Sequence, residues 1–221
     1  LRGRLVVEIQ GEKIDAATAA ELAASELGDV TAAFLATVAR SNAVPDLLSE
    51  LHPRSGGLNE DRISADKLAE LRNRYARGEI VVVRAPVAVL PKKEAEKRGH
   101  IDLFLQQAAE GVPTFNLRLR EDITVPDAGK LKTDGVLSAL VAPSGPVADL
   151  LADAEPPAHD TWTVTTKLSE NWRYASDTVR LIRAAPAKLH DLLAVGAAQE
   201  LPDELLDLFW FEGDRSEGPS E

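Results

Sequence analysis

Four consecutive apolar residues, Ile80-Val81-Val82-Val83, constrain the fold of this chain more than any other feature. Their β-branched side chains favour extended backbone, so the run predicts a strand. An apolar run without polar alternation is typical of a strand that is covered on both faces. We therefore expect an α/β or α+β fold, in which helices pack on a mixed sheet.

Other patterns predict the partners of this strand. Val136–Ala142 is a second buried run, and alternating apolar residues favour a strand over 101–106, although a helix also suits part of that stretch. Residues 115–120 alternate apolar side chains with Asn and Arg, which indicates a half-buried antiparallel strand. Prolines at both ends of residues 87–90 predict a short extended piece of its own.

Capping residues and helical spacing predict the helices. Ser64 and Gly78 bound an amphipathic helix, and Pro146 suits the first turn of a helix that runs through Asp153. A C-terminal helical segment over 177–193 contains Pro186, which should kink or divide it. Further expected elements are a strand at 5–9, helices at 15–27, 30–41 and 203–209, a helical turn at 46–51 and a tight turn at 126–129.

The length of 221 residues is enough for one or two domains. Residues 52–59 contain one proline and two glycines, which predict a loop and a boundary between subdomains. We expect a strand–helix subdomain at 1–58, a mixed-sheet domain with C-terminal helices at 59–212, and a disordered tail at 213–221. The sequence contains no methionine, so we expect it to be a piece of a longer chain.

The charge of the chain is unevenly placed. The formal net charge is −11, and residues 136–221 carry 6 basic against 15 acidic side chains. Because nucleic-acid binding depends on neutralising phosphates, we do not expect a nucleic-acid partner. The one exception would be a cationic stripe between Arg72 and Arg98, but interleaved acids favour an ordinary solvated surface there. The acidic last third promotes solubility or meets a basic partner surface.

The sequence lacks several motifs that define enzyme classes. It has no cysteine, no phosphate-binding loop, no GxGxxG, no HExxH and no GxSxG. We expect no cofactor and no bound metal. The apolar runs are too short to cross a bilayer, so we expect a cytoplasmic protein without membrane contact.

A catalytic site remains the alternative. Ser144 follows a predicted strand and precedes a helix, where nucleophiles and anion sites occur, and His100 or His159 would be its base. Asp149, Asp153 and Glu155, together with His159, would be ligands for a divalent metal. This alternative is a hydrolase or a metal-dependent nuclease, whereas the simpler interpretation is a turn followed by an exposed acidic helix end.

Aromatic residues concentrate in one segment of a chain that is only 5% aromatic. Trp162, Trp172 and Tyr174 lie close in sequence to His159, and such clusters often anchor a binding surface. We predict that these four residues bind a partner. The alternative is that the rings cover the edge of the sheet.

Residues 134–162 also carry a resemblance to a known family. After a buried strand they read Gly-Pro-x-Ala-x-Leu-Leu-x-Asp-Ala-Glu-x-Pro-Ala-His-x-x-Trp. This stretch resembles a poorly characterised region downstream of the ATP-binding domain in large bacterial ATPases of the Hsp90/histidine-kinase-like superfamily. The resemblance implies a non-catalytic region of a multidomain protein. It does not imply ATP binding, because the Asn-bearing helix and Gly-rich lid of that superfamily have no match here.

The sequence therefore favours a non-catalytic accessory or interaction module of a larger bacterial cytoplasmic protein, attached to an ATPase. Its partner would be another protein or other domains of the same chain. The aromatic cluster, the acidic last third and the absent enzyme motifs favour this hypothesis over the catalytic one.

Overall fold

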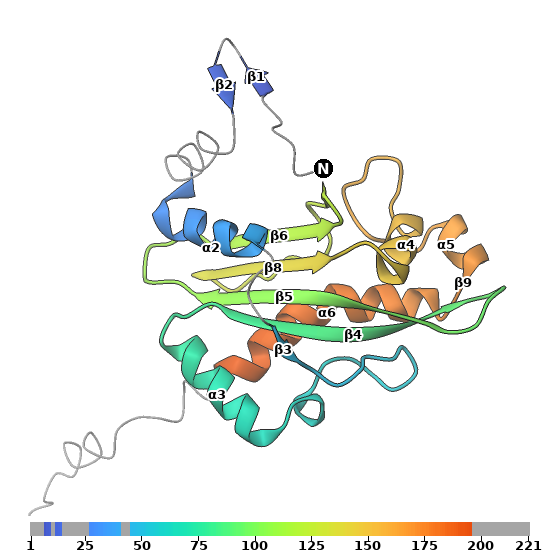
Figure 1. Cartoon of the computed structure of the whole chain (residues 1–221), viewed down its shortest axis with the longest axis horizontal. Coiled ribbons are helices and arrows are strands. Elements are labelled where there is room, and N and C mark those ends of the chain that lie inside the picture. The colour runs from blue at the N-terminus through green and yellow to red at the C-terminus, as the bar shows by residue number, and fades with distance from the viewer. Residues whose placement is uncertain (1–6, 10–11, 15–26, 41–44, 196–221) are drawn as a thin grey trace, which may run out of the picture.

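A mixed sheet of seven strands forms the centre of the molecule, and five helices pack on it, as the computed structural model shows (Figure 1). The structure describes residues 7–9, 12–14, 27–40 and 45–195. A long helix follows the last strand of the sheet, so the predicted mixed α/β class and the predicted C-terminal helical segment are confirmed. Within the described residues, no helix combines the length and the apolar character that a membrane span requires.

The elements have the following bounds. The sheet consists of β3 (Asp46–Leu47), β4 (Val81–Pro91), β5 (Lys97–Gln107), β6 (Phe115–Arg120), β7 (Ile123–Thr124), β8 (Val136–Ala142) and β9 (Trp172–Arg173). The helices are α2 (Asp29–Arg40), α3 (Ala65–Ala76), α4 (Pro146–Asp153), α5 (Thr166–Asn171) and α6 (Ala175–Ala194), with a 3₁₀ turn at Glu60–Arg62. A separate antiparallel pair is formed by β1 (Val7–Ile9) and β2 (Glu12–Ile14).

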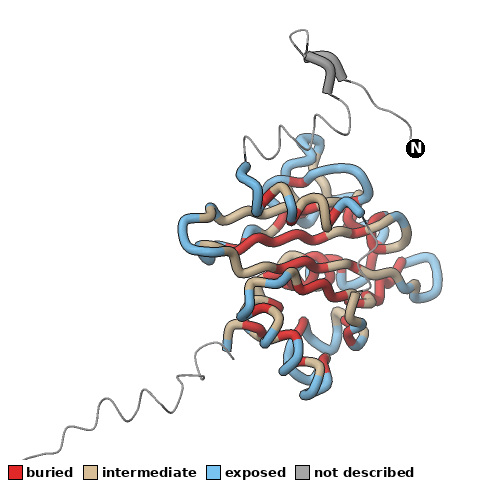
Figure 2. Tube along the Cα trace, turned by 60° about the vertical axis from the view of Figure 1, so that its left-hand side comes forward, coloured by how far each residue is buried: buried red, intermediate tan, exposed pale blue. Residues whose placement is uncertain are grey.

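Both faces of the sheet are covered, as the apolar run at 80–83 predicts. On one face, alternate residues of β4, β5 and β8 form a core with α3, α4 and α6. On the other face, Phe34 and Val38 of α2 pack against Val82, Phe104 and Leu137. The burial pattern in Figure 2 follows this arrangement, with buried residues concentrated in the central strands.

The strand β4 is longer than the sequence suggests. It continues from Val81 to Pro91 without a break, so the separate short piece predicted at 87–90 is wrong. Pro86 has no N–H to donate, but its carbonyl accepts a hydrogen bond from the Leu51 N–H at 2.7 Å. A proline without a ladder donor is tolerated where its N–H is not needed. In the same way Pro186 lies inside one helix, α6, and does not divide it.

The strand β6 differs from the prediction in its pairing and in its buried face. It pairs in parallel with β8 along its whole length and is antiparallel only to the two-residue β7. Its arginines face the core, since Arg118 is 1% and Arg120 is 7% exposed. Burial of a guanidinium requires partners for its N–H groups, and the turn after β7 and the end of α4 supply them.

The described residues between 46 and 58 pack on the central sheet. The stretch expected to be a helical turn begins with β3, which pairs in parallel with β4. Leu48, Leu51 and Leu58 belong to the same core as α3 and α6. Leucines before the predicted boundary at 58/59 thus share a core with residues after it, and the division into two subdomains stays a prediction. The helices predicted at 15–27 and 203–209 and the tail at 213–221 lie outside the described residues, apart from Leu27.

Candidate functional site

The two tryptophans of the predicted partner-binding cluster are core residues. Trp162 is 0% and Trp172 is 8% exposed. The indole N–H of Trp162 donates to Glu155 Oε1 at 3.2 Å, and that of Trp172 donates to Asp153 Oδ2 at 2.9 Å. A buried indole needs such an acceptor, and here two carboxylates at the end of α4 provide it. Both indole rings therefore pack within the core of the protein.

Glu155 is the centre of the first network. Its carboxylate accepts two hydrogen bonds from Arg120, at 2.6 and 3.0 Å, and lies 2.7 Å from His159 Nδ1. Burial would raise the pKa of Glu155, but the hydrogen bonds from Arg120, His159 and Trp162 outweigh it and hold the pKa below its ordinary value. The network joins the end of β6 to the segment after α4.

Asp153 is the centre of the second network. It accepts hydrogen bonds from Trp172 and from Asn171, and Lys167 lies 2.7 Å away. Burial raises its pKa, yet the hydrogen bonds from these three partners hold the pKa below the ordinary value. Two residues of the predicted catalytic alternative, Asp153 and His159, are thus engaged in different networks.

Two further catalytic candidates, Ser144 and Asp149, are exposed at the start of α4. Within the described ranges, no three His, Cys, Asp or Glu side chains are placed to hold a metal ion. The hydrolase or nuclease alternative stays a prediction.

The two carboxylate networks predict the acid sensitivity of the fold. A carboxylate whose pKa is lowered by folding stabilises the protein above its unfolded pKa, about 4, and loses that contribution as pH falls through the folded pKa. We expect the free energy of unfolding to fall as the pH decreases from about 5 to 3. Denaturant titrations at each pH measure this free energy. Its decrease with falling pH should be smaller in Glu155→Gln than in the unsubstituted protein. Equal slopes in both proteins would contradict the assignment.

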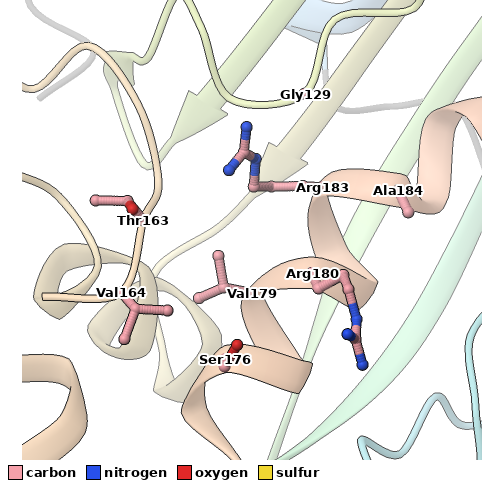
Figure 3. A pocket seen from close by; sticks show the side chains of 8 residues that line it. All are labelled: Gly129, Thr163, Val164, Ser176, Val179, Arg180, Arg183 and Ala184. Atoms are coloured by element: carbon pink, nitrogen blue, oxygen red, sulfur yellow. The ribbon is translucent and has the colours of Figure 1, made fainter.

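A surface groove lies beside these networks, along the first half of α6. It consists of two adjacent cavities with volumes of about 380 and 470 Å³, which share Val164 and Ser176. We call it the α6 groove. Its lining residues are Lys92, Gly129, Thr163, Val164, Ser169, Trp172, Arg173, Tyr174, Ala175, Ser176, Val179, Arg180, Arg183 and Ala184. The first cavity opens between the 163–164 loop and α6 (Figure 3).

The backbone presents Tyr174 at the rim of this groove. The strand β9 is fixed to β4 by the pairs Leu90↔Arg173 and Pro91↔Trp172, and α6 begins directly after it. Tyr174 connects the two elements with a left-handed backbone, at φ 53°. Such a conformation is costly for a tyrosine and often occurs at functional sites. Tyr174 is 45% exposed, whereas Trp172 is 8% exposed, and both of these predicted binding residues line the groove.

Cations surround the groove without carboxylate partners. Arg183 donates to the Trp162 carbonyl at 2.9 Å, and Lys92 donates to the Ser169 carbonyl at 2.6 Å. The Arg54 guanidinium lies 5.7 Å from the centre of the Tyr174 ring, and Arg173 is exposed. Within the part of the chain that the structure describes, none of these four cations forms a salt bridge with a carboxylate. Their positive charge is therefore available to a ligand.

Arg180 does not add to this charge. Figure 3 shows its guanidinium turned away from the other lining side chains, and it pairs with Asp177 at 2.6 Å.

The predicted stripe between Arg72 and Arg98 is likewise largely neutralised. Six of its cations form salt bridges with carboxylates: Arg72, Arg74, Arg77, Arg84, Lys97 and Arg98. Most of the charge of the stripe is thus compensated, whereas the four groove cations Arg54, Lys92, Arg173 and Arg183 form no salt bridge with a described carboxylate.

A buried arginine supports the wall of the groove. Arg118 donates to the Gly129 carbonyl through Nε at 3.2 Å and Nη2 at 2.9 Å, and to Ser138 Oγ at 3.1 Å. Burial lowers the pKa of Arg118 to about 10, so the group stays charged at neutral pH. These bonds hold the turn that carries Gly129 against α6. Sequence patterns contain no signal for Arg118, Arg54 or Arg183, because their roles depend on contacts between distant segments.

Comparison of the chain with protein-family models, curated proteins and solved structures finds no match. The resemblance of residues 134–162 to the ATPase region stays a prediction. The interpretation of the site therefore depends on its geometry.

Proposed function

We propose that this chain is a cytoplasmic, non-catalytic interaction module of a larger bacterial protein, which binds an acidic segment of a protein partner in the α6 groove. The observation that carries the proposal is the cluster of cations without a described carboxylate partner, Arg54, Lys92, Arg173 and Arg183, around this groove in a chain of net charge −11. Attachment to an ATPase is part of the same proposal, and its support is the resemblance of residues 134–162.

The chemistry of the groove favours a peptide that is both acidic and apolar. Val164 is 53% and Tyr174 is 45% exposed, so these two side chains offer apolar contact area. Carboxylates of a bound peptide would meet the guanidinium groups at the rim, which form strong charge-assisted hydrogen bonds. Complementary charge mainly gives orientation and partner choice, while the apolar contacts contribute affinity.

Charge reversal at the rim tests this proposal. The probe is a fluorescently labelled 13-residue peptide in which five glutamates are interleaved with leucine and phenylalanine. Arg173→Glu should weaken its binding about fivefold in a fluorescence-anisotropy titration, because an exposed ion pair contributes about 1 kcal/mol or less. The effect should shrink at high salt, since exposed charges are screened.

Lys132→Glu is the matched control. Lys132 is an exposed cation on the loop before β8 and does not line the groove, and the substitution changes the net charge by the same amount. If Arg173→Glu and Lys132→Glu weaken binding of the peptide equally, its affinity depends only on the net charge of the protein and the groove is not its binding site.

A further inference from the structure

A stretch near the end of the sequence has the composition that the α6 groove favours. Residues 200–212 read Glu-Leu-Pro-Asp-Glu-Leu-Leu-Asp-Leu-Phe-Trp-Phe-Glu, with five carboxylates, seven large apolar side chains and no cation. We propose that residues 200–212 of the same chain dock in the α6 groove and compete with the partner. This inference rests on the proposed function, because it names one occupant of the same groove.

The pattern of the segment matches the two kinds of contact that the groove offers. Three leucines, at positions 201, 205 and 208, are spaced by four and then three residues. Three carboxylates have the same spacing one position earlier, at Glu200, Glu204 and Asp207. On a helix, each of these two sets forms a stripe, and the stripes lie side by side. An amphipathic helix of this kind binds a groove through its apolar stripe, while the acidic stripe meets the cations at the rim.

The connection is long enough for docking within one chain. The helix α6 has 20 residues and ends at Ala194, so its far end lies about 30 Å from the residues at its start. The nearer wall of the groove, at Arg183 and Ala184, is about 15 Å from Ala194 along the helix axis. An extended chain spans about 3.3 Å per residue, so residues 195–199 can bring the segment back to that wall.

The first experiment measures the docking directly. Because the chain has no cysteine, spin labels can be placed on the full chain at Glu170→Cys, beside the groove residue Ser169, and at Gly213→Cys, directly after the segment. Pulsed electron-spin distance measurements should show a short-distance population for this pair. Replacing the five carboxylates of residues 200–212 with their amides should abolish that population. If the distances are broad and do not respond to the amide substitutions, the inference is overturned.

Dilution of the labelled chain with unlabelled chain separates the two possible sources of the segment. A short distance that persists supports docking within one chain, whereas a distance that is lost on dilution shows that a second copy supplies the segment and overturns the inference as stated.

The second experiment separates this inference from the proposed function. If the segment occupies the groove nine-tenths of the time, the five amide substitutions should tighten binding of the probe peptide about tenfold. If the probe binds at the groove with the same affinity in both chains, the proposed function stands and the docking inference fails. If the probe shows no dependence on Arg173 in the amide variant, the proposed function itself fails.

Discussion

Replacing Trp162 with alanine should lower the free energy of unfolding by about 4 kcal/mol, since truncation of a fully buried tryptophan typically costs about 3–5 kcal/mol. The side chain is 0% exposed and packs in the core that α4 and α6 share with the sheet. The substitution also leaves Glu155 without one of its three hydrogen-bonding partners. Equilibrium unfolding in urea, followed by far-UV circular dichroism, measures the change.

Trp162→Phe is the control for this prediction. Phenylalanine keeps much of the apolar volume but has no indole N–H, so its cost should be clearly smaller than that of alanine. A Trp162→Ala protein with unchanged stability would contradict the placement of this ring in the core and would restore the surface-anchor hypothesis for Trp162.

Gly129→Ala should destabilise the protein by about 3 kcal/mol for two reasons that add. Gly129 has φ +80°, a left-handed conformation that costs an alanine about 1 kcal/mol. A Cβ atom there would also lie 2.5 Å from the carbonyl oxygen of Arg183 in α6, and overpacking of this kind costs about 1–3 kcal/mol. The atoms of Arg183 that it would meet belong to backbone, so no side-chain rotation relieves the clash.

Gly56→Ala isolates the first reason, the left-handed backbone. Gly56 has a similar φ of +89°, but a Cβ atom at this position meets no other atom within 4 Å. Its substitution should cost only about 1 kcal/mol. Thermal unfolding of both variants gives the difference between them, and an equal loss would show that the turn and α6 are less close than the structure places them.

The sequence allows prediction of elements that local patterns define. The strand Val136–Ala142 and the helix from Pro146 to Asp153 agree with the structure residue for residue, because an apolar run and a proline in the first helical turn are local signals. The pairing of β6 with β8 is not local, since the strands belong to segments about twenty residues apart and nothing in either one specifies a parallel partner. Alternation in β6 shows which side chains share a face, but not which face will be covered.

The site was predictable only in part. The concentration of aromatic residues pointed to this region, and Trp172 and Tyr174 do line the groove. It did not distinguish a core ring from an exposed one, since Trp162 and Trp172 are buried by partners that come from other segments. The cations Arg54, Lys92 and Arg183 reach the groove from a loop, from the residue after β4 and from α6, so only the folded chain brings them together.

The position of β8 between β5 and β6 has a consequence for the order in which the chain folds. The β4–β5 hairpin closes over the short connection Lys92–Glu96, and such local closure is fast. The pairing of β5 with β8 instead encloses residues 108–135, which include all of β6. We therefore expect β6 to have only the two-residue strand β7 beside it until the later strand β8 has docked. The guanidinium of Arg118 then leaves water only in a late step, when the carbonyl groups that replace its hydration are already in place.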